Sequence, residues 1–513
     1  MAAATLPKGV SKSSFAKAVA DYRRILGAGN VLIDAEKLAP YSKIMIPAPI
    51  AQHQPAGALI VRSVEEIRQV LAVSNKYKTP LWPISTGRNI GYGSAAPATP
   101  GQLILDMRNM NKIIEIDPVL CTALVEPGVT YKQLVDYINE RRLDLWVSFP
   151  SSGGLSGPMG NTLERGVGYT RCGEHIANFS GLEVVLANGE VLRTGLGGIP
   201  NTTAWQSYRW GYGPWVDGLF SQSNFGIVTK MGIWLMPKPA AHQPYVIAWG
   251  DLESMAKGVE VAGRLRRENV IENGVAGTTM YGLAAQVRRS EIYQGEGAIP
   301  EEVLAKLYKD RGLPPYAMSA VLYGTEAQLA TNSQIVKEAF EQAGGRFLTG
   351  KDIEGNHDAI HWENMMTGKP ELSEFGQYNY RGGGGAAWIA PAVPPRASDV
   401  IKSSTITADI VRKYGFDYTG GFLIGLSGRH TEHVADLLYN RADPEEMKRA
   451  HACFKEALAA SAAAGYGVYR TNPAFFDQAA ETYGPQQRAF NKRLKKALDP
   501  NGIIAPGKSG IYV

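Results

Sequence analysis

Three glycine-containing segments carry residue types that could hold an anionic cofactor. In the first, residues 83–93 read PISTGRNIGYG. Its glycines would let backbone N–H groups converge on an anion, and Ser85, Thr86 and Asn89 add short polar side chains. The same composition suits an ordinary surface turn. We interpret the segment as a phosphate-binding loop and keep the turn as the alternative.

Two further segments extend this pattern. Residues 160–169 read GNTLERGVGY and again combine glycines with polar side chains. Residues 381–386 read RGGGGA, which is typical of a flexible linker. Tyr378, Tyr380 and Trp388 flank that run closely, and this weakens the linker interpretation.

Two nucleotide motifs do not fit the chain. Residues 502–509 read GIIAPGKS and match G-x-x-x-x-G-K-[ST], but that motif requires a following helix, and the sequence reaches Val513 first. No G-x-G-x-x-G follows a predicted strand, so we do not expect a Rossmann-type dinucleotide site. A different phosphate-binding device is needed.

Histidine spacing offers a possible metal site, which we do not favour. His357 and His361 stand four residues apart, with Glu363 nearby, and could share one helical face. A third ligand at a suitable spacing is not evident, so a surface helix is the preferred interpretation. His430 and His433, with Glu432 between them, suit a pocket lining or a surface better than a metal site. We predict no metal.

Composition limits the classes of function. The 513 residues predict two or three large units, and the net charge of +5 comes from interspersed charges, which disfavours nucleic acid as a partner. The sequence contains no apolar run of membrane-spanning length and no signal-peptide pattern at its start, so the cytoplasm is the default expectation. Its three cysteines form no disulfide framework and no C-x-x-C-H haem motif.

Apolar spacing predicts an α+β chain. Residues 63–77 have helical periodicity, and residues 103–106, 113–116 and 123–125 are short β-type runs. Asn188-Gly189 between two apolar runs predicts a hairpin. Near residue 240 the sequence pattern changes, because long amphipathic helical segments then alternate with isolated strands and glycine-rich turns become fewer. We predict domains at 1–240 and 241–465, with residues 466–513 as a C-terminal segment.

These segments resemble the vanillyl-alcohol oxidase and 4-cresol dehydrogenase family of flavoproteins. The resemblance covers nearly the whole chain and is most specific at residues 83–93, 160–170, 182–194, 376–388, 468–471 and 499–510. It implies an FAD-binding domain of two α+β subdomains, of the PCMH type. It also implies an α+β cap domain built on an antiparallel sheet.

The resemblance implies which residues contact FAD. They are Ser85, Thr86, Gly87, Arg88, Asn89, Ile90, Gly91, Gly160, Asn161, Arg165, Gly166, Gly168, Tyr169, Ile227 and Lys508. Lys508 would lie near the flavin N1 and C2 oxygen, where a cation stabilises the reduced ring; a surface lysine is the alternative. Ala386 stands where histidyl-linked members carry histidine. Cytochrome-linked members attach the flavin through a tyrosine before the glycine run, so the resemblance implies a covalent link through Tyr378.

The resemblance also implies a phenolic substrate, held by Tyr92, Tyr469 and Arg470. A phenol has a pKa of about 10, so holding a phenolate at pH 7 costs about 4 kcal/mol. An arginine and two phenolic donors can supply that stabilisation. The expected reaction is oxidation of the benzylic carbon of 4-alkylphenols through hydride transfer and a p-quinone methide.

Departures from the family bear on the electron acceptor and the substrate. Residues 150–156 contain no acid where oxidase members carry an aspartate, which favours a c-type cytochrome over oxygen. Such a partner would make a periplasmic location the alternative to the cytoplasm. Gly421 and Glu432 replace a glutamate and a histidine of cytochrome-linked members, and we expect them to line an enlarged substrate pocket. We also expect a homodimer. The remaining alternatives are a peroxide-forming oxidase and a non-catalytic flavin- or nucleotide-binding protein.

Overall fold

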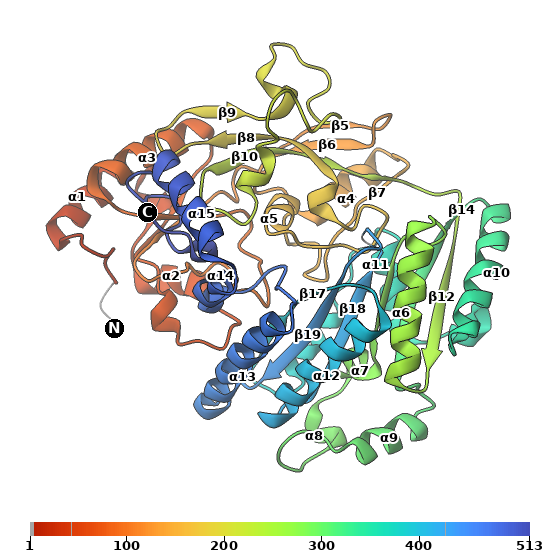
Figure 1. Cartoon of the computed structure of the whole chain (residues 1–513). Helices are drawn as coiled ribbons and strands as arrows, with labels where there is room; N and C mark the ends of the chain where they lie inside the picture. Colours follow the sequence, from red (N-terminus) through yellow and green to blue (C-terminus); the bar gives the residue numbers. More distant parts are fainter. Residues whose placement is uncertain (1–4, 43, 426) are drawn as a thin grey trace.

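The computed structural model describes residues 5–42, 44–425 and 427–513. The N-terminal residues, red to yellow in Figure 1, contain two sheets. Most of the green to blue residues form a third sheet with its helices. The predicted α+β class is confirmed.

The first sheet positions the segment at residues 83–93. Its order is β1-β2-β4-β3, with β2 and β3 each parallel to β4. The strands are β1 Val31–Leu32, β2 Gly57–Ile60, β3 Leu81–Ile84 and β4 Leu103–Asp106. Helix α3, Val64–Tyr77, begins where Ser63 accepts a hydrogen bond from the Glu66 backbone, so the predicted helix is confirmed. The segment 83–93 therefore begins inside a buried strand and leaves it as a loop.

The second sheet is antiparallel throughout, in the order β5-β6-β10-β8-β9. The strands are β5 Ile113–Asp117, β6 Thr122–Val125, β8 Phe179–Val185, β9 Val191–Arg193 and β10 Ile227–Trp234. The turn between β8 and β9 contains Gly189 at φ 85°, a conformation that favours glycine. The hairpin predicted from Asn188-Gly189 is confirmed.

The third sheet is the antiparallel platform that the resemblance implies. Its order is β15-β12-β14-β13-β18-β19-β16, and β17 also pairs with β19. The strands are β12 Ala241–Trp249, β13 Gly274–Thr278, β14 Tyr316–Gly324, β15 Arg346–Thr349, β16 Gly385–Ile389, β17 Ala392–Val393, β18 Gly420–Ile424 and β19 Thr431–Tyr439. Helices α6 Leu252–Arg267, α12 Ala397–Lys413 and α13 Pro444–Ala463 lie side by side against one face (Figure 1). On the opposite face, α11 His357–Met366 packs against β12 and β14, and side chains of the FAD-binding region belong to the same hydrophobic cluster.

The other elements are mostly helical. They are α1 Lys12–Leu26, α2 Ala35–Ser42, α4 Tyr131–Glu140, α5 Pro158–Leu163, α7 Thr279–Gln286, α8 Arg289–Ile292, α9 Glu301–Asp310, α10 Glu326–Gln342, α11 His357–Met366, α14 Phe476–Glu481 and α15 Pro485–Leu498. A short ribbon pairs β7 Leu145–Trp146 with β11 Met236–Pro237. The turn at Ser373–Asn379 is a 3₁₀ helix.

The C-terminal segment returns to the first sheet. Ile504 forms a parallel bridge with Leu81 of β3, and the Leu81 N–H donates to Ile503 O at 2.7 Å. Figure 1 accordingly draws the blue helices α14 and α15 among the red and orange elements. The domain limits at 240 and 465 stay predictions, although β12 at Ala241 is where the chain enters the third sheet.

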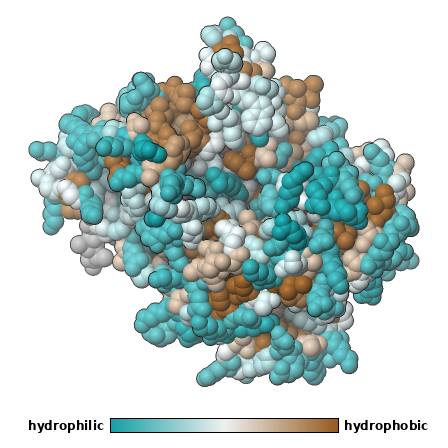
Figure 2. Space-filling model, viewed as in Figure 1, coloured by the Kyte–Doolittle hydropathy of each residue, from teal (hydrophilic) through white to brown (hydrophobic). Residues whose placement is uncertain are grey.

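One face of the molecule is mostly hydrophilic (Figure 2). On the face drawn in Figure 2, hydrophilic residues surround several separate apolar groups. No helix in the described ranges is long and apolar enough to cross a membrane.

Candidate active site

A cavity lies where the loops of the first two sheets meet the third sheet. One wall consists of residues from the first loop and from α5, and the opposite wall includes Trp388, Gly421 and Val434. Tyr469, Arg470 and Lys508 close it from the C-terminal segment. The cavity therefore forms only when segments from the whole chain come together.

The first loop suits the phosphate oxygens of a dinucleotide. The backbone N–H groups of residues 85–89 donate no hydrogen bond to any residue that the structure describes. Gly87 and Gly91 have φ values of 68° and 73°, which allow the backbone to curl around an anion. A Cβ on Gly160 would lie 2.4 Å from Ser85 Oγ, so glycine there lets the two loops approach each other. The residues present fit FAD.

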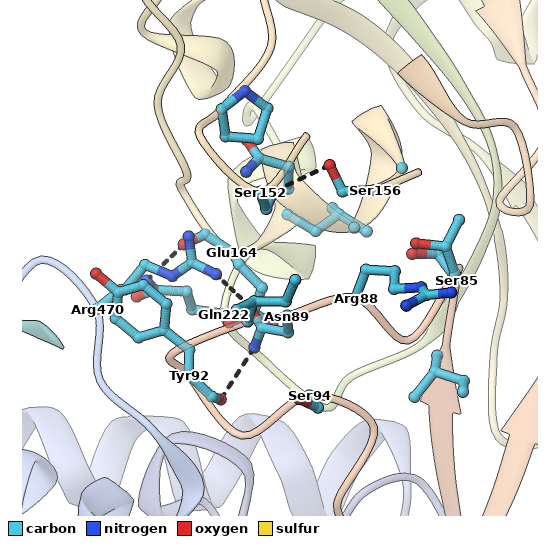
Figure 3. Close-up of a pocket in the computed structure, with 18 of the residues that line it drawn as sticks. Ser85, Arg88, Asn89, Tyr92, Ser94, Ser152, Ser156, Glu164, Gln222 and Arg470 are labelled. Atoms are coloured by element: carbon cyan, nitrogen blue, oxygen red, sulfur yellow. Dashed lines mark hydrogen bonds between the residues drawn. The ribbon is translucent and has the colours of Figure 1, made fainter. Parts of the chain in front are cut away.

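Most of the predicted cofactor residues line this cavity. They are Ser85, Thr86, Gly87, Arg88, Asn89, Ile90, Gly160, Asn161, Tyr169, Ile227 and Lys508. The first loop therefore lines a cavity, and its role in binding phosphate stays a prediction. Ser85, Arg88 and Asn89 are labelled in Figure 3 along the lower wall of the cavity.

Six other predicted residues are not among the described residues that line this cavity, and Tyr378 is the last of them. A Cβ on Gly166 would lie 2.3 Å from the Asn161 amide, and one on Gly168 would lie 2.4 Å from Ser148 Oγ. A Cβ on Gly91 would overlap the Trp388 ring. Arg165 donates to Ser221 Oγ at 3.0 Å and lines a neighbouring cavity.

Glu432 is the fifth, and it corrects the predicted substrate pocket. Its buried side chain turns to His430, with 3.7 Å between Glu432 Oε1 and His430 Nε2. Gly421 does line the cavity, and Val434 is its partner in the sheet. Only one of the two predicted substrate-pocket residues is therefore exposed to the cavity.

Tyr92, Tyr469 and Arg470 form one polar cluster. The Tyr92 and Tyr469 hydroxyls lie 3.1 Å apart, and Arg470 Cζ lies 3.9 Å from the centre of the Tyr92 ring. The Arg470 guanidinium donates to Asn89 Oδ1, and the Asn89 amide donates to Tyr92 O at 3.1 Å (Figure 3). Arg470 Nε is buried and has no hydrogen-bond partner among the described residues. The cluster has an unused donor, as a site for an oxyanion requires.

The electrostatics of the cluster make its tyrosines donors. Burial raises the pKa of the Tyr92 hydroxyl well above its usual value, although Arg470 opposes the shift. Burial likewise raises the pKa of Tyr469. Both side chains are therefore protonated at neutral pH and can donate to a bound anion, while Arg470 supplies the positive charge.

Lys508 is buried against the cavity and paired with an acid. Its Nζ lies 2.7 Å from a Glu164 carboxylate oxygen. Burial lowers the pKa of Lys508, and Glu164 opposes that shift. The alternative of a surface lysine is wrong, because Lys508 is 7% exposed.

Tyr378 lies beside the cavity but is not among its described lining residues. Its ring stacks on Phe375, with 5.7 Å between ring centres, and its buried hydroxyl has no hydrogen-bond partner in the described part of the chain. Burial raises the pKa of this hydroxyl well above its usual value, and Glu374 and Asp436 add to the shift. The hydroxyl is thus unsatisfied and close to two acids.

Sequence reasoning missed those two carboxyl groups. Glu374 lines the cavity and accepts a hydrogen bond from Tyr281 at 2.9 Å. Asp436 is 2% exposed, neither of its carboxyl oxygens has a partner among the described residues, and burial raises its pKa well above the usual value. An acid inside the wholly buried strand β19 was the available signal.

The histidine pair at 357 and 361 does not lie on a surface helix as expected. His361 of α11 is buried, whereas His357 is exposed. Across residues 5–42, 44–425 and 427–513, His, Cys, Asp and Glu side chains form no group of three suited to a metal.

Comparison with known proteins agrees with this architecture. Residues 55–195 match the FAD binding domain family, and residues 301–509 match the C-terminal domain of FAD linked oxidases. The chain is 45% identical over 511 residues to the 4-cresol dehydrogenase [hydroxylating] flavoprotein subunit of Pseudomonas putida, covering 99% of this chain and 98% of the relative. It is 30% identical to 1'-carboxy-chondrochloren decarboxylase of Chondromyces crocatus, covering 96% of each.

Solved structures give the same result. A substrate-bound p-cresol methylhydroxylase structure superposes with a TM-score of 0.97 at 45% identity, covering 99% of both chains. The 4-ethylphenol oxidase of Gulosibacter chungangensis, in complex with isoeugenol, superposes with a TM-score of 0.95 at 33% identity, again over 99% of both chains. This chain is therefore an FAD-dependent oxidoreductase that belongs to the vanillyl-alcohol oxidase and 4-cresol dehydrogenase family of flavoproteins.

Proposed function

We propose that this chain oxidises the benzylic carbon of 4-alkylphenols. The observation that carries the proposal is the cluster of Tyr92, Tyr469 and Arg470 inside the cavity, with two neutral hydroxyls 3.1 Å apart beside a guanidinium. This arrangement suits a phenolate oxygen. The names of the two similar solved structures, a cresol methylhydroxylase and an ethylphenol oxidase, support the same substrate class.

The cluster activates the substrate by ionising it. Binding a phenol as its phenolate at pH 7 costs about 4 kcal/mol, which three charge-assisted or phenolic hydrogen bonds in a dry site can offset. Electron density from that oxygen reaches the para carbon and weakens the benzylic C–H bond. When bound, FAD supplies the two-electron oxidant that accepts the hydride. The oxidised substrate is a p-quinone methide.

The buried acids suit the second half of the reaction. Water adding to the quinone methide gives a 4-hydroxybenzylic alcohol, and a further oxidation gives the aldehyde or ketone. The attacking water must lose a proton, and Glu374 is a carboxyl group that faces the cavity. Asp436, one layer back, raises the pKa of nearby tyrosines rather than facing the cavity itself.

Disruption of the cluster tests the proposed function. We expect Tyr469→Phe and Arg470→Ala each to lower kcat/KM for 4-ethylphenol by roughly a hundredfold, because loss of one oxyanion donor typically costs about 3 kcal/mol. Steady-state assays with an artificial electron acceptor measure the loss. Tyr466→Phe is the matched control, because its hydroxyl instead donates to Asp399 at 2.7 Å. Near wild-type activity in both cluster variants would place the phenolate elsewhere.

We further propose that FAD is linked covalently through the Tyr378 oxygen to the flavin 8α carbon. Its buried hydroxyl without a partner, next to the cavity, supports this. Acid-precipitated Tyr378→Phe protein should be colourless, whereas wild-type protein should stay yellow. Tyr380→Phe is the control, because that hydroxyl is already bonded to Asp417 at 2.9 Å. Flavin retained by precipitated Tyr378→Phe protein would exclude the link.

The proposed electron acceptor is a separate c-type cytochrome. Where oxidase members carry an acid, this cavity presents Ser152 and Ser156, whose hydroxyls lie 2.9 Å apart (Figure 3). We expect turnover of 4-ethylphenol to reduce a c-type cytochrome much faster than it forms hydrogen peroxide in air. Parallel measurement of both rates decides between the dehydrogenase and the oxidase, which is the second candidate. Peroxide formed as fast as an artificial acceptor is reduced would favour the oxidase.

Gly421 should widen the range of substrates. The three atoms nearest to an added Cβ are backbone atoms, of which Ala276 O is closest at 3.3 Å. Wild-type protein should turn over 4-ethyl- and 4-propylphenol at least as efficiently as 4-cresol, because each well-packed methylene contributes about 0.8 kcal/mol. Gly421→Leu should lower kcat/KM for the propyl substrate more than for 4-cresol, which serves as the internal control. A steep fall from methyl to propyl in wild-type protein would contradict the enlarged pocket.

A further inference from the structure

A line of buried polar side chains runs from the cavity to the protein surface. It begins at Glu374, which lines the cavity, and passes to His361 of α11. It ends at Glu371, whose side chain is 24% exposed. The distances are 4.0 Å between Glu374 Oε2 and His361 Nε2, and 2.6 Å between His361 Nδ1 and Glu371 Oε2.

Two unsatisfied atoms meet at the centre of this line. His361 Nε2 and Glu374 Oε2 are both buried, and neither has a hydrogen-bond partner among the described residues. The other Glu374 oxygen already accepts the Tyr281 hydroxyl at 2.9 Å. A small movement of either side chain would close the gap to a hydrogen bond, and that bond would join the cavity to His361.

The outer half of the line fixes the tautomer of the imidazole. Glu371 can only accept when ionised, so the proton of a neutral His361 ring lies on Nδ1, and Nε2 presents its lone pair to Glu374. Although burial alone would raise the pKa of Glu371, hydrogen bonds from His361 and Ser373 lower it overall. The Trp362 ring meets the imidazole edge-on, with 4.6 Å between ring centres, and restrains its orientation.

Two neighbouring acids offer no comparable route. Glu164, which also lines the cavity, is ion-paired with buried Lys508. Asp436 is not among the described lining residues, and both of its carboxyl oxygens are buried without a partner among the described residues. A proton delivered to Glu374 has His361 within 4.0 Å and a part-exposed carboxylate beyond it.

We propose that Glu374, His361 and Glu371 form a proton relay from the active site to solvent. The relay rests on the proposed function, because it serves the addition of water to the quinone methide. As the water oxygen bonds to the benzylic carbon, an electron pair shifts to the ring oxygen and the water proton passes to Glu374. Glu374 then passes that proton to His361 Nε2. The Nδ1 proton of His361 moves to Glu371, and Glu371 releases a proton to bulk water. His361 and Glu371 act through Glu374 and do not touch substrate.

The test separates oxidation from hydration in one anaerobic turnover of the FAD-loaded protein with 4-ethylphenol. In His361→Gln, bleaching of the flavin should keep the wild-type rate, because hydride transfer precedes the relay. Decay of the quinone methide, followed by its near-ultraviolet absorbance, should slow by about tenfold or more, since general base catalysis contributes about 10²-fold or more. Imidazole added to the buffer should restore it. Glu371→Gln should slow decay in the same way without stopping bleaching.

A second histidine–glutamate pair provides the matched control. His242 Nε2 lies 3.4 Å from Glu363 Oε1, also on α11, and both side chains are about one-third exposed. His242→Gln should leave both rates unchanged. Equal methide decay in the His361 and His242 variants would overturn the relay and leave phenol oxidation intact.

A measurement that needs no turnover keeps the two proposals distinguishable. Nitrogen-15 NMR of histidine-labelled protein, with His361 assigned by its loss in His361→Gln, should show a proton on Nδ1 of the His361 ring. A ring protonated at Nε2 overturns the relay whatever the substrate. Failure of every 4-alkylphenol to bleach wild-type flavin would overturn the proposed function, and the relay to the quinone methide with it.

Discussion

The return of the C-terminal segment to the first sheet is the constraint on which the site depends. It is held by Lys495, whose ammonium is fully buried and binds Asp499 Oδ2 at 2.7 Å, Asn224 O at 2.7 Å and Ile504 O at 2.6 Å. A buried charge that is paired and fully hydrogen-bonded tolerates little displacement, because any lost partner leaves it uncompensated. The bridge between Ile504 and Leu81 then sets Lys508 against Glu164.

The contact between the FAD-binding region and the third sheet is also closely packed. The Trp388 ring from β16 stacks on Tyr92 at 5.4 Å, and it lies where a side chain on Gly91 would be. Interiors are close-packed, so a larger residue at 91 would push the two regions apart. The same glycine thus permits the loop conformation and lets the sheet approach the phenolate cluster.

The cavity combines two kinds of buried polar group, a cation beside two tyrosines and a carboxyl group beside a histidine. Arg470 supplies positive charge beside Tyr92 and Tyr469, whose pKa values are raised by burial. Glu374 belongs to a second set, and its Oε2 lies 4.0 Å from His361 Nε2. The site thus contains buried acids as well as a cation, although the sequence pattern indicated only the cation and its two tyrosines.

The sequence by itself determined the local structure. The Asn188-Gly189 turn and the patterns of residues 63–77 and 103–106 depend on neighbours in the chain, and their predictions are confirmed. Loop composition and the family resemblance likewise indicated the cavity-lining residues between 85 and 90. Only the tertiary structure decided that Glu432 turns to His430, that Gly166 and Gly168 support the loop from behind, and that His361 is buried beside Glu374. Those outcomes depend on contacts between residues far apart in sequence, and the direction of a side chain on a wholly buried strand has no periodic signal to reveal it.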